Sequence, residues 1–518
     1  MTKIVWMLLT CVALTDAYRI LVVFPFPGKS HGILGDGFVR HFLAAGHEVT
    51  YITPFPKEKP RPNLREVDVS SNKVILPPSL LNVQGLMDNK VDFTNKDLIF
   101  RLMFNITSTT LQNDYVQKLI EDTNQQFDVV VVEWMFSEAS CGFAAVFNCP
   151  CIMFFPFENP KDILALIDEP PNPAYTPVYS LRLKPPFSFS QRILSLWSHL
   201  KDYYTWISKR SDQSVFYESA FKSALTKRGR PLPSLEEMNN NISLALVNSH
   251  VSLGLSLRVP YNYINIGGYH IDTNVKPLPE NLKKIMDNAK NGVIYFSLGS
   301  NLQSKDLPYD VKKGLLYVFR GLKQTVLWKF EEDFPDLPKN VHILNWAPQP
   351  SILAHPNCIL FITHGGLLST TETVHFGVPI IGIPVFADQF LNVDEAVHRG
   401  FAKRVDLSYT MADDLKLAID DILTNPRYTQ RAKELSMIYH DRVVPPGTEM
   451  LHWVGHVVRT RGARHLRSPA SSLPLYQKWY LDFAGLVIVA LTLLLAIIKL
   501  LISTCFSSNN ADLRKKTN

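Results

Sequence analysis

The sequence has few of the features that mark a nucleic-acid-binding, redox or metal protein. Its formal net charge of +6 is small for 518 residues and gives no support to a nucleic-acid partner. The 6 cysteines include no Cys-x-x-Cys pair, so we expect buried thiols, with one disulfide left open. No Gly-x-Gly-x-x-Gly run follows the first predicted strand, which argues against a dinucleotide-dependent oxidoreductase.

The composition is that of a globular protein with more than one core. Hydrophobic residues make up 46% of the chain and charged residues 19%, so extended disorder is not expected. A chain of 518 residues exceeds what one hydrophobic core usually organises, and it contains no repeat of solenoid period. We therefore predict two or three domains.

Both ends of the sequence carry signals for a membrane route. Residues 1–17 have a positive start, an apolar core and a small last residue, as in a signal peptide. Residues 479–503 are long and apolar enough to cross a bilayer, and Trp479 and Tyr480 mark one interface. The cationic tail 504–518 is then cytosolic. This predicts a single-pass type I protein with its body in the lumen.

The other targeting signals agree with that route. Asn105 and Asn241 each open an Asn-x-Ser/Thr triplet, and we predict that both are N-glycosylated. Lys515 and Lys516 resemble the dilysine retrieval signal of endoplasmic reticulum type I proteins, although plain positive-inside charge is the alternative. The endoplasmic reticulum membrane is therefore the expected location.

The first half opens with a βαβ pattern. Arg19–Phe24 is an apolar strand signal, a turn rich in Pro and Gly follows, and helical spacing ends at Gly46 before the strand Val49–Thr53. A further buried strand, Asp128–Val132, ends at Glu133. Strands that alternate with helices predict a Rossmann-like domain.

The most informative stretch is 346–389, in the second half. Ile359–Ile362 and Val378–Ile383 are predicted strands, and Leu367–Phe376 is the predicted helix between them. Ligands of open α/β sheets bind at the carboxyl ends of such strands, and a helix N-terminus there suits a phosphate. The residues of this stretch that can contact a nucleotide sugar are Trp346, Gln349, His364, Gly366, Ser369, Glu372, Asp388 and Gln389.

Each of these residues suits one part of such a ligand. Trp346 offers a flat face to a base, and Gln349 can hydrogen-bond its edge. Glu372 shares a helix face with Ser369 and can accept from ribose hydroxyls. A diphosphate can be received by His364, the Gly366 backbone and Ser369, and sugar hydroxyls can be bound by Asp388 and Gln389.

At these residues the sequence closely resembles the signature of the UDP-glycosyltransferase family, in particular its animal, membrane-bound, arthropod-like branch. The resemblance implies a GT-B fold, with two Rossmann-like domains facing a cleft, plus one C-terminal transmembrane helix. It also implies inverting transfer of a hexose from a UDP-sugar donor to a small lipophilic acceptor, as in detoxification or conjugation. No cofactor or metal is implied, and the sequence lacks the Asp-x-Asp triplet of metal-dependent glycosyltransferases of the other common fold.

The resemblance assigns the catalytic residues as well. Ser30-His31 matches the pair in which the family places its catalytic histidine, at the start of the first helix. Glu133 stands where the family has an Asp that bonds this histidine, and Glu138 is the other candidate. Ser300, in the first turn of the second domain, is implied to approach the donor phosphates.

Several points stay open at this level. Leu367-Leu368 replace a position where many relatives have Asn, so one phosphate contact is in doubt. This supports the alternative that the protein is a catalytically weak homologue that binds UDP-sugars or lipophilic molecules. Glucose is the expected hexose and glucuronate the alternative, since no cation for a glucuronate carboxylate can be placed from the sequence. The acceptor and the oligomeric state, including a homo-oligomer, cannot be deduced.

These inferences divide the chain at defined boundaries. Residues 155–217 are rich in Pro and aromatics, and we interpret them as an irregular insertion that forms an acceptor pocket or a patch on the bilayer, with core packing as the alternative. The predicted segments are the signal peptide 1–17, the acceptor domain 18–268, a linker 269–290, the UDP-sugar domain 291–435, closing helices 436–478, the transmembrane helix 479–503 and the tail 504–518.

Overall fold

The computed structural model describes residues 17–516, apart from 77–82, 89–95, 169–170, 177–180, 182, 184, 300–301, 303 and 335. The signal peptide, apart from Ala17, and Ser300 therefore lie outside the described residues. The described chain forms two compact units, residues 1–467 and 468–518, and each is treated by itself below.

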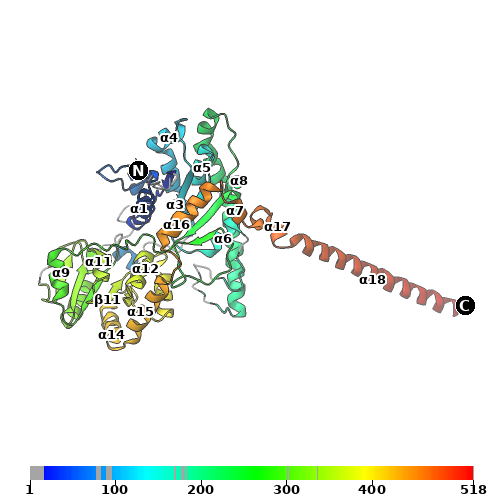
Figure 1. The fold of residues 1–518 in the computed structure, drawn as a ribbon. Coiled ribbons are helices and arrows are strands. Elements are labelled where there is room, and N and C mark those ends of the chain that lie inside the picture. Colours follow the sequence, from blue (N-terminus) through cyan, green and yellow to red (C-terminus); the bar gives the residue numbers. More distant parts are fainter. Residues whose placement is uncertain are drawn as a thin grey trace, which may run out of the picture. The chain divides into compact units, whose positions relative to one another are not determined.

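The first half of the larger unit is built on one parallel sheet (Figure 1). The strand order is β3-β2-β1-β4-β5-β6-β7, so the chain reverses direction across the sheet between β1 and β4. The strands are β1 (Arg19–Val23), β2 (Glu48–Thr53), β3 (Leu64–Asp68), β4 (Val129–Glu133), β5 (Cys151–Phe155), β6 (Ile242–Val247) and β7 (Tyr263–Asn265).

The second half repeats this plan with a second parallel sheet. Its order is β10-β9-β8-β11-β12-β13, and the reversal falls between β8 and β11. The strands are β8 (Val293–Ser297), β9 (Thr325–Lys329), β10 (Val341–Leu344), β11 (Cys358–Thr363), β12 (Ile380–Gly382) and β13 (Ala402–Arg404). Both orders are those of doubly wound Rossmann sheets, which confirms the predicted fold class.

The central strands are largely apolar because both faces of each sheet are buried there. Along β1, Leu21 and Val23 belong to one core cluster, while Ile20 and Val22 belong to the cluster on the opposite face. This period of two is the alternation of side chains along a strand. Helices cover both faces, so the sequence shows continuous hydrophobic runs instead of an alternating pattern.

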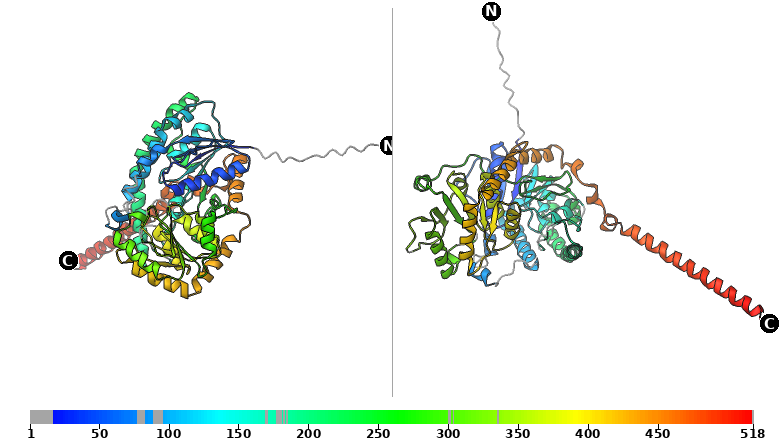
Figure 2. Two further views of the ribbon diagram at one scale, coloured as in Figure 1. Left: turned by 90° about the vertical axis from the view of Figure 1, so that its left-hand side faces the viewer. Right: turned by 90° about the horizontal axis from the view of Figure 1, so that it is seen from below.

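Helices connect the strands of both sheets (Figure 2). In the sequence of the first half they are α1 (Lys29–Ala44), η1 (Ser70–Val74), α2 (Val83–Met87), α3 (Lys96–Gln112), α4 (Asp114–Glu121), η3 (Ala139–Cys141), α5 (Gly142–Phe147), α6 (Pro160–Ile167), α7 (Phe189–Lys227) and α8 (Leu235–Asn240). Of these, α2 packs in the core cluster of the second sheet. In the second half the helices are α9 (Glu280–Asp287), η5 (Ser304–Asp306), α10 (Tyr309–Arg320), α11 (Gln349–Leu353), α12 (Leu367–Phe376), α13 (Gln389–His398), α14 (Met411–Thr424) and α15 (Arg427–His440).

The prediction of an irregular insertion over 155–217 was wrong. Helix α7 takes up 39 residues, and it begins with a capping box in which Ser188 and Gln191 satisfy each other's backbone N–H groups. Ser-x-x-Gln is a helix-start signal that the sequence displays at this point, and the surrounding Pro and aromatic residues obscured it. Cys141 and Cys151 form a disulfide, which the sequence had left as an open possibility.

Helix α16 (Pro446–Arg459) returns the chain to the first sheet. Its buried residues Met450, Val454 and Val457 pack in the same core cluster as Ile20 and Val22 of β1, and it also contacts α1. The last helix of the larger unit thus covers a face of the first sheet, although it follows the second domain in sequence. Short 3-10 turns, η6 (Arg464–Leu466) and η7 (Pro469–Ser472), follow it.

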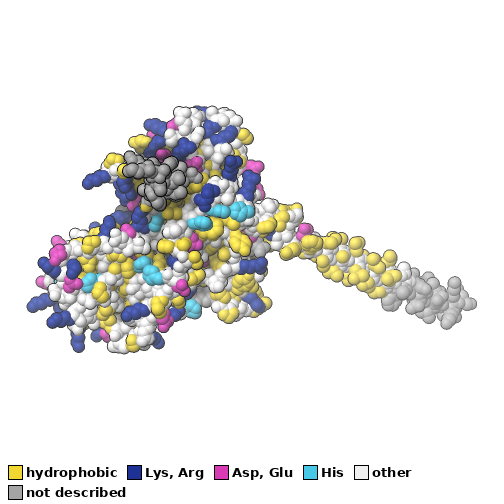
Figure 3. All heavy atoms as spheres, viewed as in Figure 1, with side chains coloured by type: hydrophobic (Ala, Val, Ile, Leu, Met, Phe, Trp, Pro, Cys, Tyr) yellow, Lys and Arg dark blue, Asp and Glu magenta, His cyan; other side chains and the backbone are white. Residues whose placement is uncertain are grey.

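The smaller unit is helical, with α17 (Leu475–Lys478) and α18 (Leu481–Lys516). Within residues 481–504 of α18, an 18-residue window has a mean hydropathy of 2.9 and is 0% buried. Figure 3 shows hydrophobic side chains along this helix. By length and composition the segment can cross a membrane.

Candidate active site

The predicted catalytic pair lies at the reversal point of the first sheet. His31 is in the first turn of α1, which follows β1, and Glu133 is the last residue of the neighbouring strand β4. The distance from His31 Nδ1 to Glu133 Oε1 is 2.5 Å. A carboxylate can only accept, so Nδ1–H donates, and Nε2 keeps the lone pair that can take a proton.

The environment of Glu133 makes it a strong partner for a charged imidazole. Its side chain is 0% exposed, and its second oxygen, Oε2, has no hydrogen-bond partner in the part of the chain that the structure describes. The alternative candidate, Glu138, instead accepts a hydrogen bond from Trp134 Nε1 at 3.1 Å. The geometry therefore pairs His31 with Glu133, as the sequence favoured.

His364 lies at the matching point of the second sheet. It follows β11, whose neighbour β8 ends in the turn that contains Gly299. A Cβ on Gly299 or on Gly366 would come within 2.5 or 2.6 Å of the His364 ring, so both positions must be glycine for the ring to fit. Gly299 also has a φ of +91°, a conformation that glycine adopts without strain.

Burial controls the charge of His364. Burial, together with the smaller effect of the nearby Lys329, lowers the pKa of this imidazole to about 4. The ring is therefore neutral at physiological pH. Its Nδ1 is buried without a hydrogen-bond partner among the residues described. A neutral imidazole beside the N-terminus of α12 can donate one N–H to a phosphate oxygen.

Three of the predicted donor-binding residues form one hydrogen-bonded group. Gln349 Nε2 donates to Ser369 Oγ at 2.9 Å and to Glu372 Oε2 at 2.7 Å. Ser369 and Glu372 thus share a face of α12, as their spacing predicted. Burial raises the pKa of Glu372 to about 7, while the bond from Gln349 opposes that rise.

The opposite rim of the site comes from the loop before α13. Asp388 Oδ2 accepts from Asn392 Nδ2, and burial raises the pKa of Asp388, while interaction with His31 of the first domain opposes the rise. Gln389 uses its Oε1 to accept from the backbone N–H groups of Val385 and Phe386. Only its amide N–H groups are then available to a ligand. If Gln389 binds a sugar hydroxyl as predicted, it must therefore donate the hydrogen bond.

Trp346 is 61% exposed, as a base-stacking residue must be. The ammonium group of Lys29 lies 5.3 Å from the centre of its ring. Lys29 precedes His31 by two residues, so the turn that carries the predicted base also reaches the second domain. Lys29 could not be predicted from the sequence, because only the folded arrangement brings residues 29 and 346 together.

The packing of Leu368 gives a structural reason for an apolar residue where many relatives of the family have Asn. Its side chain packs against the core cluster of the first sheet, together with residues such as Leu43 and Leu451. An apolar residue at this position therefore strengthens the contact between the domains, and it offers no hydrogen bond to a phosphate.

The glycosylation sites are accessible. Asn105 is exposed on α3, and Asn241 is exposed directly after α8, where its Oδ1 accepts from Arg467. Their modification stays a prediction.

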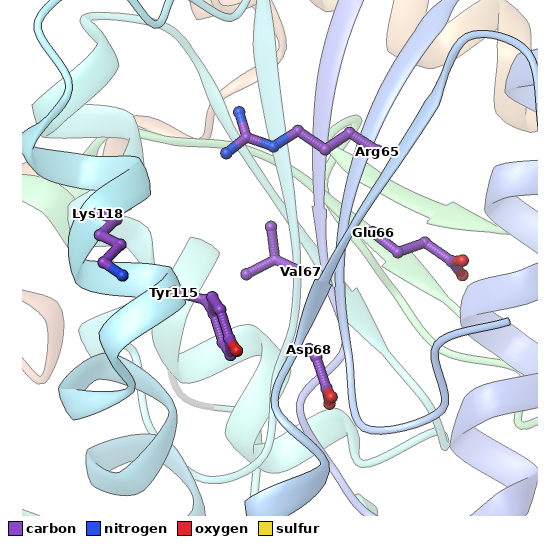
Figure 4. Close-up of a pocket in the computed structure, with 6 residues that line it drawn as sticks. All are labelled: Arg65, Glu66, Val67, Asp68, Tyr115 and Lys118. Carbon is purple, nitrogen blue, oxygen red and sulfur yellow. The ribbon is translucent and has the colours of Figure 1, made fainter. Parts of the chain in front are cut away.

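Two further features lie apart from the site. A surface pocket of about 190 Å³ lies between β3 and α4, lined by Arg65, Glu66, Val67, Asp68, Tyr115 and Lys118 (Figure 4). None of these residues belongs to the candidate site. No group of three or more His, Cys, Asp or Glu side chains in the described ranges is arranged to hold a metal ion.

Comparison with known proteins finds similar sequences and similar folds. The family model described as "UDP-glucoronosyl and UDP-glucosyl transferase" matches residues 64–516. UDP-glucosyltransferase 2 of Dactylopius coccus is 32% identical over 97% of this chain and 96% of its own length. UDP-glucuronosyltransferase 2B1 of Rattus norvegicus is 29% identical over 80% and 76%. A UDP-glucosyltransferase structure from Polygonum tinctorium has a TM-score of 0.55 at 16% identity, covering 86% of this chain and 99% of that one.

Replacing Glu133 tests the pairing with His31. Glu133→Gln should lower kcat by about 10²- to 10⁴-fold, because an amide no longer stabilises the imidazolium or fixes its tautomer. Affinity for UDP should stay unchanged. Steady-state kinetics and UDP titration give the two values. Glu138→Gln is the matched control and should retain activity; equal losses in both variants would contradict the assignment.

The pKa of Glu372 predicts that donor binding releases protons. Below about pH 7 this carboxyl is protonated, and above it the ionised form accepts strongly from ribose hydroxyls. UDP-sugar affinity should therefore rise from pH 6 to 8, with proton release near pH 7. Calorimetry in buffers of different ionisation enthalpy measures the release. UDP-glucose is the ligand to use, since it has no terminal phosphate that titrates near pH 6. Glu372→Gln should abolish the effect; persistence of the release would contradict it.

Proposed function

The chain belongs to the UDP-glucuronosyl and UDP-glucosyl transferase family, and from this premise we propose that it transfers glucose from UDP-glucose to a small lipophilic acceptor, with inversion at the anomeric carbon. The contact between His31 and Glu133 carries the proposal, because it gives one residue the form of a general base. Glucose is favoured because the Dactylopius relative that covers 97% of this chain is called a glucosyltransferase. Conjugation for detoxification is the role that such an activity would serve.

The proposed reaction is a single displacement. His31 Nε2 takes the proton of the acceptor hydroxyl, and Glu133 stabilises the imidazolium that forms. The acceptor oxygen attacks the anomeric carbon from the face opposite UDP. The bond from that carbon to the diphosphate oxygen breaks, and UDP leaves with its electron pair. The proton remains on His31 until it passes to solvent.

The second domain would hold the leaving group. The uracil would stack on Trp346, and ribose would bond to Glu372. The diphosphate would face His364, the N–H groups at the start of α12 and Ser369, which are donors placed where negative charge develops. With these donors the proposed transfer requires no metal and no cofactor. Asp388 and the Gln389 amide would bind the hexose hydroxyls.

Lys29 would supply the positive charge that Leu368 cannot. It extends from the first domain over Trp346, at the base end of the proposed donor site. A lysine on a flexible stem can turn from the indole face to a diphosphate oxygen when the donor binds. The first domain would then contribute to donor binding as well as to proton transfer.

The body of the protein would lie in the lumen of the endoplasmic reticulum. Support comes from the apolar segment 481–504, the predicted signal peptide, the exposed asparagines of the two sequons and the dilysine end of the tail. The anchor would hold the enzyme where lipophilic acceptors concentrate.

Microsomes that contain the full chain test the proposed transfer. They are permeabilised for the activity assays, because a charged UDP-sugar does not cross a sealed bilayer, and are kept sealed for the protease assay. With a panel of phenolic acceptors, turnover should be faster with UDP-glucose than with UDP-glucuronate, and His31→Ala should lose about 10²- to 10⁴-fold in kcat while still binding UDP. Added protease should remove only the tail. Faster turnover with UDP-glucuronate would show that glucuronate, and not glucose, is the preferred sugar. Retained turnover in His31→Ala would contradict the role of His31 as the base. Degradation of the body by protease would contradict its luminal location.

Charge removal at position 29 tests the role of Lys29. Lys29→Met keeps the length of the side chain and should raise the KM for the UDP-sugar about tenfold, which is the usual worth of a charge-assisted hydrogen bond. The KM for the acceptor should not change, and Lys29→Arg should restore donor binding. A shift in the acceptor KM alone would assign Lys29 to the other substrate.

A further inference from the structure

Helix α7 changes its polarity along its length. In its second half it is an ordinary surface helix: Tyr217, Phe221 and Leu225 are buried in the core of the first domain. Polar residues such as Ser211 and Lys222 are exposed there. This half packs against α4 and α5. The hydrophobic face of this half is therefore already buried against the protein core.

The first half of α7 is inverted. Its buried side chains are polar, with Ser195 0% and His199 7% exposed, and Asp202 is paired with Lys161 of α6. Its outward side chains are large and apolar. Six of them form one set, called here the α7 stripe: Phe189, Ile193, Trp197, Leu200, Tyr204 and Ile207.

The α7 stripe is a continuous surface. Its members recur at intervals of three or four residues, which places them on one side of an α-helix. The stripe extends over about 27 Å, at 1.5 Å per residue. Trp197 is 65% and Tyr204 73% exposed, so large aromatic rings face outward near its middle and far end. An apolar surface of this extent on a polar-lined helix calls for an apolar neighbour.

We propose that the α7 stripe lies in the surface of the lipid bilayer, parallel to its plane, and holds the body of the enzyme against the membrane. The inference rests on the proposed membrane anchor. Trp, Tyr and aliphatic residues flanked by the cations Arg192 and Lys201 are the composition of interfacial helices. Their rings sit at the headgroup level, and the cations meet the phosphates.

Chain length brings the bilayer within reach. Residues 468–480 connect the body to the apolar segment, and 13 residues span at most about 45 Å when fully extended. Within the body, the end of the chain lies close to α7: Arg467 bonds Asn241 after α8, α8 contacts α6, and Lys161 of α6 pairs with Asp202 of α7. The connecting segment is therefore long enough to allow the stripe to reach a bilayer that holds the apolar segment.

A second copy of the chain fits the stripe less well. Stable protein interfaces use about 20–30 residues on each side, and the stripe is one row of side chains on a single helix. A lipid surface has no such minimum, because each apolar side chain enters it independently. The bilayer is therefore the occupant that the shape and composition favour.

The test uses the full chain in nanodiscs, with Cys149→Ser and Cys505→Ser to remove competing thiols. An environment-sensitive fluorophore is attached at Leu200→Cys in the stripe. Matched chains carry it at Leu491→Cys in the apolar segment and at Tyr317→Cys, an exposed position on α10. Quenching is measured with acyl-chain-brominated phospholipids and with aqueous iodide.

The proposal predicts that brominated lipid quenches the label at position 200 as it quenches the label at 491, and that iodide quenches only the label at 317. If position 491 responds to lipid but position 200 behaves like 317, the anchor stands and the stripe proposal is overturned. Shielding of position 200 from both quenchers would indicate a protein partner and also overturn it. A label at 491 that lipid does not quench would overturn the anchor itself.

Discussion

The site depends on the place where each parallel sheet reverses its strand order. At this place the chain segments that follow two neighbouring strands run in opposite directions. The carboxyl ends of these strands therefore border a crevice that neither connection covers. In the first sheet the two strands are β1 and β4, which bring His31 to Glu133; in the second they are β8 and β11, which bring Gly299 to His364. The reversal of strand order therefore places both the proposed base and the proposed phosphate site.

The two halves are joined closely enough for residues of one to act on residues of the other. Lys29 lies over Trp346, His31 interacts with Asp388, and Leu368 of α12 packs in the core of the first sheet. Where many relatives have an Asn that can contact the diphosphate, Leu368 makes an apolar contact between the domains instead. In our account Lys29 compensates for that exchange, and the cleft becomes a site to which both domains contribute donor contacts.

Much of this arrangement could be predicted from the sequence, because it follows from local patterns. The helix α12 has the predicted bounds, and the spacing of Ser369 and Glu372 placed them on one helix face. Lys29 could not be found, since its partner lies more than three hundred residues away in sequence. Helix α7 was missed for a different reason: the Pro and aromatic residues around its capping box indicated an irregular insertion. Only the exposure of side chains in the folded chain shows which of its apolar residues face outward.

The central claim is that one bound donor lies between the imidazole of the first domain and the phosphate site of the second. The most direct measurement is an experimental structure of the full chain with UDP bound. The account predicts uracil on the face of Trp346, the diphosphate at His364 and the start of α12, and His31 Nε2 facing the open side of the terminal phosphate while Nδ1 contacts Glu133. UDP bound elsewhere, or a His31 ring turned away from the cleft, would contradict it.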